Sequence, residues 1–340
     1  MTGLDKLSLL EVSKIKDVDG GGEYYKIVNL LSQMHANLKY GQWIPTNMTM
    51  TNVSSVIVGE PNVYTRRFNQ GTPASRPTFD TVVDDTACIE AFAVTDATML
   101  RVTGGVEQTR DRVNRAYRSA MAKKVGELQF YGNSADDETE FNGAFVRPST
   151  ANIGDYCLDA GGTTGDLGSI AIMQFLEDGL FWTYPKNTQA GLVHNDMGVR
   201  LLQESTDTAG RMIRCFVDNW QWFCGLAMPD YRCQVRVANI DISDLKGASG
   251  AQAATAYTTN LMYLIDEAVD RLPSPGSGQV VMFMPRAVRT GINRLAKILA
   301  LGNVTTVPDV FSKPVPNWQG MYPMEICDQM TITETRVVAP

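Results

Sequence analysis

Residues 59–96 constrain the fold of this chain most, because they have the composition of a long, polar β-hairpin. Two runs rich in β-branched and aromatic residues, 63–68 and 78–83, are predicted strands. Residues 70–77 between them have turn chemistry, and a further β-favouring run, 86–95, follows directly. A two-stranded ribbon is marginal in water by itself. The segment therefore predicts either an ordinary hairpin packed on its own domain or one that another chain completes.

Size and charge place the rest of the chain among ordinary globular proteins. The 340 residues, 44% of them apolar and 20% charged, can form one large core or two domains. A formal charge of −7 argues against a mainly electrostatic nucleic-acid binder. Locally, however, residues 101–132 hold seven basic and three acidic side chains, and residues 136–140 are strongly acidic.

Cysteine usage and the N-terminal residues indicate folding in a reducing cytoplasm. Six cysteines are spread over the chain without a close CxxC pair, which is not a disulfide framework. Residues 1–18 lack the apolar core of a secretory signal. No stretch approaches the roughly 20 apolar residues that a membrane helix needs, so no membrane partner is expected.

Helical periodicity is clearest in residues 104–131, where apolar side chains form one stripe and arginines occupy the other face. At about 1.5 Å per residue this helix is a rod of roughly 40 Å. Asp111 and Arg115 are spaced to form an ion pair on it. Residues 24–38 suit a shorter amphipathic helix, and the first 45 residues look like an arm that lies on something else.

The remainder of the chain mixes strands and helices without a regular βαβ repeat, which predicts an α+β fold. Helices are predicted at 261–272, stopped by Pro273, and from Pro285 to a stop at Gly302. Predicted strands share β-favouring or continuous apolar composition; they are 213–216, 220–228, 234–240, 279–284 and 322–330.

The chain offers little material for catalysis or metal binding. Its two histidines, His35 and His194, do not suffice for a triad or a zinc site, and the glycine-rich loop 159–166 lacks a phosphate-binding spacing. Three cysteines recur every nine residues: Cys215, Cys224 and Cys233. We interpret them as buried thiols rather than as metal ligands, because zinc ligands are usually paired two to four residues apart. The acidic pairs 84–85 and 136–137 have no spacing for shared-proton chemistry. We expect no catalytic residues, metal or cofactor, and no enzymatic activity.

Taken in order, the arm, the extended hairpin, the long helix and the mixed α+β region resemble a tailed-phage major capsid protein of the Hong Kong 97-type fold. Local motifs similar to a podovirus-like subgroup carry the resemblance more specifically; they are 130–133 (FYGN), 159–163 (DAGGT), 184–192 (YPKNTQAGL), 222–226 (WFCGL) and 236–241 (RVANID).

The resemblance implies a division of the chain. Its segments are an N-terminal arm, 1–45; a first part of a peripheral domain, 46–58; an extended loop, 59–96; a second peripheral part, 97–165, with a spine helix 104–131; an axial domain, 166–317; and a C-terminal peripheral strand region, 318–340. In such shells the extended loop lies across an adjacent subunit, which would complete the hairpin.

The implied function is self-assembly into an icosahedral shell around double-stranded DNA, as hexamers and pentamers with a portal at one vertex. The implied location is the virion capsid, assembled in the cytoplasm of a bacterial host. The resemblance leaves open whether a cement protein also binds the shell. Residues 59–96 contain no lysine, so the isopeptide chainmail of the namesake shell is not expected. Forty-five arm residues cannot hold a scaffolding region, so a separate scaffolding protein is implied.

Two sets of residues are candidates for function. Inter-subunit contacts are expected from charged and aromatic residues of the loop: Arg66, Arg67, Phe68, Arg76, Asp84, Asp85 and Glu90. A genome-facing role is expected for the basic helix face: Arg110, Arg112, Arg115, Arg118, Lys123 and Lys124. The alternatives are a solvated helix face, another phage structural protein such as a decoration or tail-tube subunit, and a cytoplasmic hydrolase.

Overall fold

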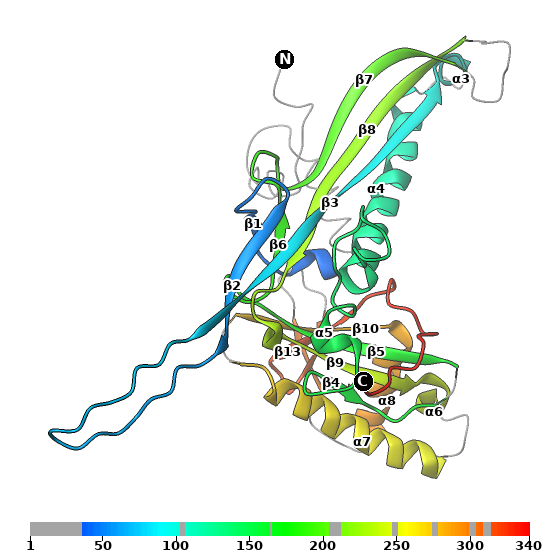
Figure 1. Ribbon diagram of the computed structural model, residues 1–340. Coiled ribbons are helices and arrows are strands. Elements are labelled where there is room, and N and C mark those ends of the chain that lie inside the picture. The colour runs from blue at the N-terminus through cyan, green and yellow to red at the C-terminus, as the bar shows by residue number, and fades with distance from the viewer. Residues whose placement is uncertain are drawn as a thin grey trace.

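The computed structural model describes residues 36–102, 106–163, 165–203, 212–246, 251–273, 278–298, 304–308 and 314–340. Two β-sheets, a long helix and a thin projecting ribbon make up this part of the chain (Figure 1). The arm helix expected at 24–38 lies outside the described residues, except that its last residues form the 3-10 helix η1 (Ala36–Lys39).

A six-stranded sheet forms the upper half of the molecule in Figure 1. Its central strand, β8, pairs with three other strands. In order across the sheet the strands are β1 (Trp43–Pro45), β6 (Phe181–Tyr184), β8 (Met212–Ala227), β3 (Thr78–Asp96) and β2 (Thr51–Gly59), and β7 (Gly191–Gln203) also pairs with β8.

Helix α4 (Val106–Tyr131) covers one face of this sheet, after the short helix α3 (Ala97–Val102). Met121, Val125 and Leu128 of α4 belong to the same buried hydrophobic cluster as Trp220 and Trp222 of β8. Small residues of β3 lie in the same core, which lets the helix approach the strand closely. The helix predicted at 104–131 is therefore confirmed, and its predicted apolar stripe is buried at Met121, Val125 and Leu128 but not at Ala120.

A seven-stranded sheet forms the second half, with helices α6 (Ile242–Lys246), α7 (Ala251–Asp270) and α8 (Arg286–Ile298) beside it. Its strands in order are β11 (Val304–Pro308), β12 (Pro314–Trp318), β13 (Tyr322–Ile326), β10 (Gln279–Met284), β5 (Leu167–Phe175), β9 (Gln234–Asp241) and β4 (Cys157–Asp159). The short helices α5 (Pro148–Ala151) and η2 (Tyr231–Cys233) join these parts.

Strands β5 and β10 are buried on both faces and join the two hydrophobic cores. Alternate residues, such as Ala171 and Phe283, face the core under α4, whereas Ile172 and Met282 face the core under α7 and α8. Burial on both faces explains why β10 is a continuous apolar run, and the strand predicted at 279–284 is confirmed. Both predicted helices of this half are confirmed as α7 and α8; Gly302 lies outside the described residues.

Strand pairing contradicts part of the expected division of the chain. Strands β6 to β8 fall within the range 166–317, yet they pair in the sheet that α4 covers. Strand β13 falls within 318–340, yet it lies between β12 and β10 in the other sheet. The runs 213–216 and 220–228 form one continuous strand, β8. These differences share a cause, because pairing between residues far apart in sequence leaves no local pattern.

Among the described residues, no helix has both the length and the apolar character that crossing a bilayer requires.

Candidate subunit interface

Strands β2 and β3 leave the body of the molecule together as an antiparallel ribbon (Figure 1). The second half of β3 pairs with β8, but residues 78–83 pair only with β2 among the described residues. Beyond the strands, residues 60–77 form an extended tip that contains one turn, with Gln70 N donating to Arg67 O at 3.2 Å. Ser75 Oγ donates to Asn62 O at 2.7 Å and joins the two limbs of the tip.

The hairpin prediction was right about a ribbon and wrong about its strands. Residues 63–68 form no strand, and the partner of 78–83 is β2, which lies before the predicted hairpin. Residues 86–95 belong to the chain's own sheet, so only the first part of the 59–96 segment lacks a core. The Pro61, Pro73 and Pro77 residues of the tip cannot donate ladder hydrogen bonds, which explains the loss of strand structure there.

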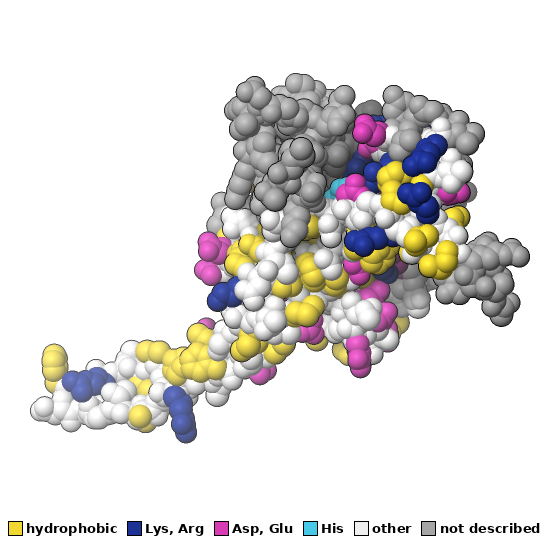
Figure 2. All heavy atoms as spheres, turned by 90° about the horizontal axis from the view of Figure 1, so that it is seen from above, with side chains coloured by type: hydrophobic (Ala, Val, Ile, Leu, Met, Phe, Trp, Pro, Cys, Tyr) yellow, Lys and Arg dark blue, Asp and Glu magenta, His cyan; other side chains and the backbone are white. Residues whose placement is uncertain are grey.

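The ribbon exposes apolar side chains in a regular arrangement. Ile57 and Phe79 stand directly opposite each other, and they are 59% and 63% exposed. Val53 and Val83 form a second facing pair four residues along, so the four share one face of the ribbon. At the tip, Phe68 is 98% exposed. Figure 2 shows hydrophobic side chains along this projection, and contiguous exposed apolar surface marks interaction sites.

Three of the predicted contact residues, Arg66, Arg67 and Arg76, lie on the exposed tip together with Phe68. Within the described residues no carboxylate pairs with these arginines, and Arg66 Nη1 reaches only Gln70 O, at 3.5 Å. Asp85 is half-buried at the base of the ribbon. Glu90 is exposed on the body, where it accepts a hydrogen bond from Asn219 Nδ2 at 2.7 Å.

Asp84 is not available to a neighbouring subunit, so this contact prediction was wrong. It is only 2% exposed, and its carboxylate pairs with Arg147 of the same chain at 2.7 Å. Its other oxygen accepts from Met228 N at 3.0 Å. Arg147 also donates to Leu226 O at 2.6 Å. A buried carboxylate needs such partners, and the sequence analysis missed Arg147 because a single arginine in an irregular segment gives no local signal.

Two of the six basic residues proposed to face a genome are instead fastened to the chain itself. Arg110 Nη2 pairs with Asp218 at 2.8 Å and with Asp196 at 2.9 Å. Arg118 is buried beside the ring of Trp220 and reaches Asp111 at 3.3 Å. The prediction was wrong for these two, since a 3.6-residue period does not show which helix face a sheet covers.

The other four basic residues of α4 reach the surface. Arg115 pairs with Asp111 at 2.7 Å, which confirms the predicted ion pair. Lys124 binds Glu140 at 3.0 Å. Arg112 and Lys123 are exposed.

The remaining candidates for chemistry are structural. His194 stacks on Trp220, with 4.1 Å between ring centroids, and its Nε2 lies 3.0 Å from Asp218 Oδ1. Cys215, Cys224 and Cys233 are buried, as predicted. Burial raises the pKa of the Cys233 thiol to about 12, so it is an inert, protonated side chain at neutral pH.

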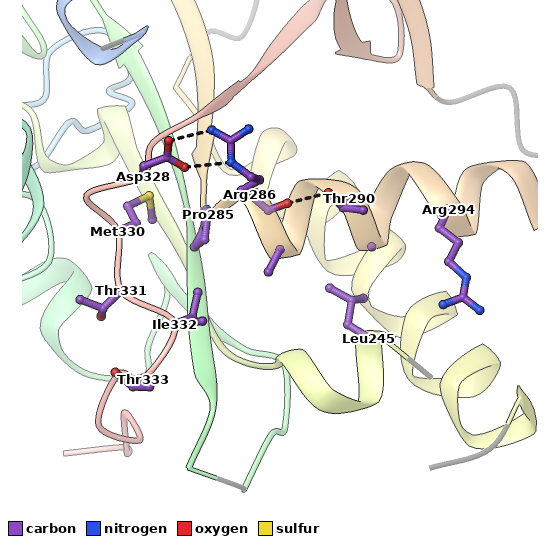
Figure 3. A pocket seen from close by; sticks show the side chains of 12 residues that line it. Leu245, Pro285, Arg286, Thr290, Arg294, Asp328, Met330, Thr331, Ile332 and Thr333 are labelled. Atoms are coloured by element: carbon purple, nitrogen blue, oxygen red, sulfur yellow. Dashed lines mark hydrogen bonds and ion pairs between the residues drawn. The ribbon is translucent and has the colours of Figure 1, made fainter. Parts of the chain in front are cut away.

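A groove of about 760 Å³ lies between α8 and the C-terminal segment (Figure 3). Leu245, Gly291 and Ile332 line it together with threonines, and Arg286 at its rim pairs with Asp328 at 2.7 Å. Its lining contains no histidine or cysteine, and the arginine and carboxylate at the rim satisfy each other. This arrangement gives the groove no catalytic group.

The long helix on a twisted sheet, the second mixed sheet and the ribbon that leaves the body define a capsid protein of the Hong Kong 97-type fold. A structure of bacteriophage Epsilon15 superposes with a TM-score of 0.66 at 21% identity, covering 87% of this chain and 88% of that chain. The capsid of bacteriophage JBD30 matches with a TM-score of 0.49 at 10% identity, covering 95% and 99%. No curated protein sequence matches the chain.

The family model described as major capsid protein GP7 matches residues 19–338, and the chain belongs to this family. It is a phage major capsid protein, a structural component of the virion shell, and not an enzyme. The function and the fold class expected from the sequence are thereby confirmed, and the decoration, tail-tube and hydrolase alternatives fall away.

Proposed function

We propose that the β2–β3 ribbon, residues 51–83, is the element by which each copy holds a neighbour in the shell. The observation that carries this proposal is the apolar face formed by the exposed Ile57, Phe79 and Val83 together with the half-buried Val53. In a free subunit this face meets only water, and covering it in a neighbour removes that cost at about 25 cal/mol per Å² of apolar surface. Many such modest contacts sum to a stable closed shell.

The tip adds charge to the same contact. Arg66, Arg67 and Arg76 have no carboxylate partner among the described residues, and the proposal assigns them to acidic groups of an adjacent copy. Asp85 and Glu90 are the remaining acidic candidates for contacts with arginines of another subunit. Charge pairs at the edge of such an interface favour the correct register more than they add affinity.

The assembly follows the plan of the fold: hexamers and pentamers close around double-stranded DNA, with a portal at one vertex and a separate scaffolding protein during assembly in the host cytoplasm. The DNA-facing role is kept only for the exposed helix residues Arg112, Arg115, Lys123 and Lys124. Because Arg115 and Lys124 already pair with carboxylates, Arg112 and Lys123 would carry most of it.

The apolar contact is tested by the variant Ile57→Asp/Phe79→Asp, co-expressed with a scaffolding candidate. We expect subunits that keep the unfolding midpoint of the wild type, because both side chains are exposed, but that form no closed shells in negative-stain microscopy. The matched control is Tyr263→Asp, an exposed residue of α7 outside the ribbon. Normal shells from the ribbon variant would refute the proposal.

The tip is tested by charge reversal, Arg66→Glu/Arg67→Glu, which should impair assembly and leave the fold of the subunit intact. Wild-type shells dissolved in denaturant should run as single chains of 37.4 kDa, because residues 59–96 hold no lysine for a cross-link. A ladder of covalent oligomers would contradict this second expectation.

A further inference from the structure

The groove between α8 and the C-terminal segment is an apolar surface that the described residues leave open (Figure 3). Leu245 of α6 and Met330 line it and are each 3% exposed, whereas Ile332 of the C-terminal segment is 42% exposed. Its volume of about 760 Å³ lies within the range of ligand pockets, roughly 300–1,000 Å³. An open apolar groove of this size is typical of a docking surface.

The described chain begins beside this groove. Helix η1 lies against β13, and its Asn37 is only 1% exposed. Asn37 and Gln329 both pack at Gly126 of α4, where an added Cβ would meet them at 2.8 and 3.2 Å. Gln329 stands between Asp328 and Met330, which line the groove. The residues that precede η1 therefore start from a fixed point next to the groove.

The preceding residues 24–35, here called the arm segment, lie outside the described residues but have the pattern and the length to fill the groove. Ile27, Leu31 and Met34 recur at the spacing of one helix face, and Gln33 falls on the opposite face. As a helix, these residues would be about 18 Å long. Helix α8, which forms one wall of the groove, has 13 residues and is about 20 Å long.

Charge favours the same arrangement. The end of the arm segment next to η1 starts near Asp328, which pairs with Arg286 at the first residue of α8. A segment that enters the groove there runs antiparallel to α8 and brings the residues before it to the last turns of α8. Helix α8 contains four basic residues and no acidic one, and Arg294 is exposed near its end. The residues just before the arm segment are acidic, which complements this charge; they are Asp17, Asp19 and Glu23.

We propose that the arm segment of each copy docks in the groove of its own chain, with Ile27 and Leu31 against Leu245 and Ile332. The groove supplies the apolar cover that the arm segment cannot make for itself. Because η1 holds the segment beside the groove, its effective concentration there exceeds that of a segment from another copy. The contact involves neither the ribbon nor its tip, so it does not depend on how the ribbon docks.

Cysteine cross-linking of unassembled subunits tests the proximity. In the variant Leu31→Cys/Ile332→Cys, oxidation should give a disulfide between the two new cysteines, found by peptide mapping in a species of single-chain mass. The two single variants measure the background from the exposed Cys88. The control Leu31→Cys/Tyr263→Cys places the second cysteine on an exposed site of α7 and should give no such link. Absence of the link in the first variant, or a link only between two chains, would overturn the inference.

Hydrogen exchange tests the apolar contact in the same subunits. The variant Ile27→Ser/Leu31→Ser should make the amides of α8 and of residues 328–333 exchange about tenfold faster, because the groove then loses its cover. The matched control is Asn29→Ser/Gln33→Ser, which changes the opposite face of the arm segment and should leave this exchange unchanged. Equal protection in the apolar variant and the wild type would show that the arm segment does not occupy the groove.

Discussion

At the scale of single residues, Arg147 and Asp84 decide where the free ribbon begins. Asp84 sits where β3 passes from the ribbon into the body, and Arg147 ties it to the carbonyl of Leu226 at the end of β8. Both side chains are almost fully buried. The pair therefore fixes the base of the ribbon, while the residues beyond it are free to meet another subunit.

Arg147→Met should lower the free energy of unfolding by about 3–5 kcal/mol, because it leaves the Asp84 carboxylate buried without its cation. Urea unfolding of the unassembled subunit measures this. The exposed Arg112→Met serves as the control and should stay within about 0.5 kcal/mol of the wild type. A loss below about 1 kcal/mol for Arg147→Met would mean that water reaches Asp84 and replaces the arginine.

At the scale of elements, one carboxylate fastens the start of α4 to the sheet. Asp218 of β8 accepts from Arg110 at 2.8 Å and from Asn114 at 3.2 Å, and His194 of β7 lies 3.0 Å away. Burial alone would raise the pKa of the Asp218 carboxyl, but hydrogen bonds from His194, Arg110 and Asn114 outweigh it and hold the pKa below its usual range.

This depressed pKa predicts how the attachment of α4 depends on pH. The contribution of Asp218 to stability is fully present above its unfolded pKa of about 4 and is lost as pH falls through the lower folded-state pKa. The wild type and Asp218→Asn should therefore differ in their free energy of unfolding by a constant amount from about pH 8 to 5. This difference should shrink below about pH 4. Urea unfolding of both proteins at each pH measures it. A gap that widens on acidification would contradict the assignment.

At the scale of the whole molecule, the C-terminal residues join the two halves. Glu334 accepts from Tyr131 Oη at the end of α4 at 2.5 Å and from Arg236 of β9 at 2.9 Å, and it also binds Ser169 of β5. Further along, Val337 N donates to Asn239 Oδ1 at 2.8 Å. The last residues thus act as a strap between the long helix and the second sheet, although they form no regular strand.

Glu334→Gln should weaken this connection by about 3 kcal/mol or more, because Arg236 is then buried without a counter-charge. Thermal and urea unfolding of the subunit give the measurement, and Thr333→Ala, an exposed neighbour, is the control. If the strap holds the halves together, the variant should also show unequal unfolding of the two sheets in hydrogen exchange. Unchanged stability would show that the strap is dispensable.

The sequence by itself determined the elements whose signal is local. Helices α4, α7 and α8 repeat their apolar residues with the helical period, and strand β10 is a short continuous apolar run, so 6–26 consecutive residues suffice to identify each. Within the tip only the turn segment 70–77 was recognisable, because its glycine, prolines and polar residues cannot build a core, whereas the strand predicted at 63–68 was wrong.

Only the tertiary structure decided which elements meet. The partner of β3 is β8, more than a hundred residues later, and β13 lies in the second sheet rather than beside α4. The same long-range pairing buries Asp84 against Arg147 and turns Arg110 and Arg118 inward, which removed them from the predicted surfaces. Strand pairing and burial depend on contacts between side chains that are distant in sequence. The periodicity of apolar residues, by contrast, can be read from each segment alone.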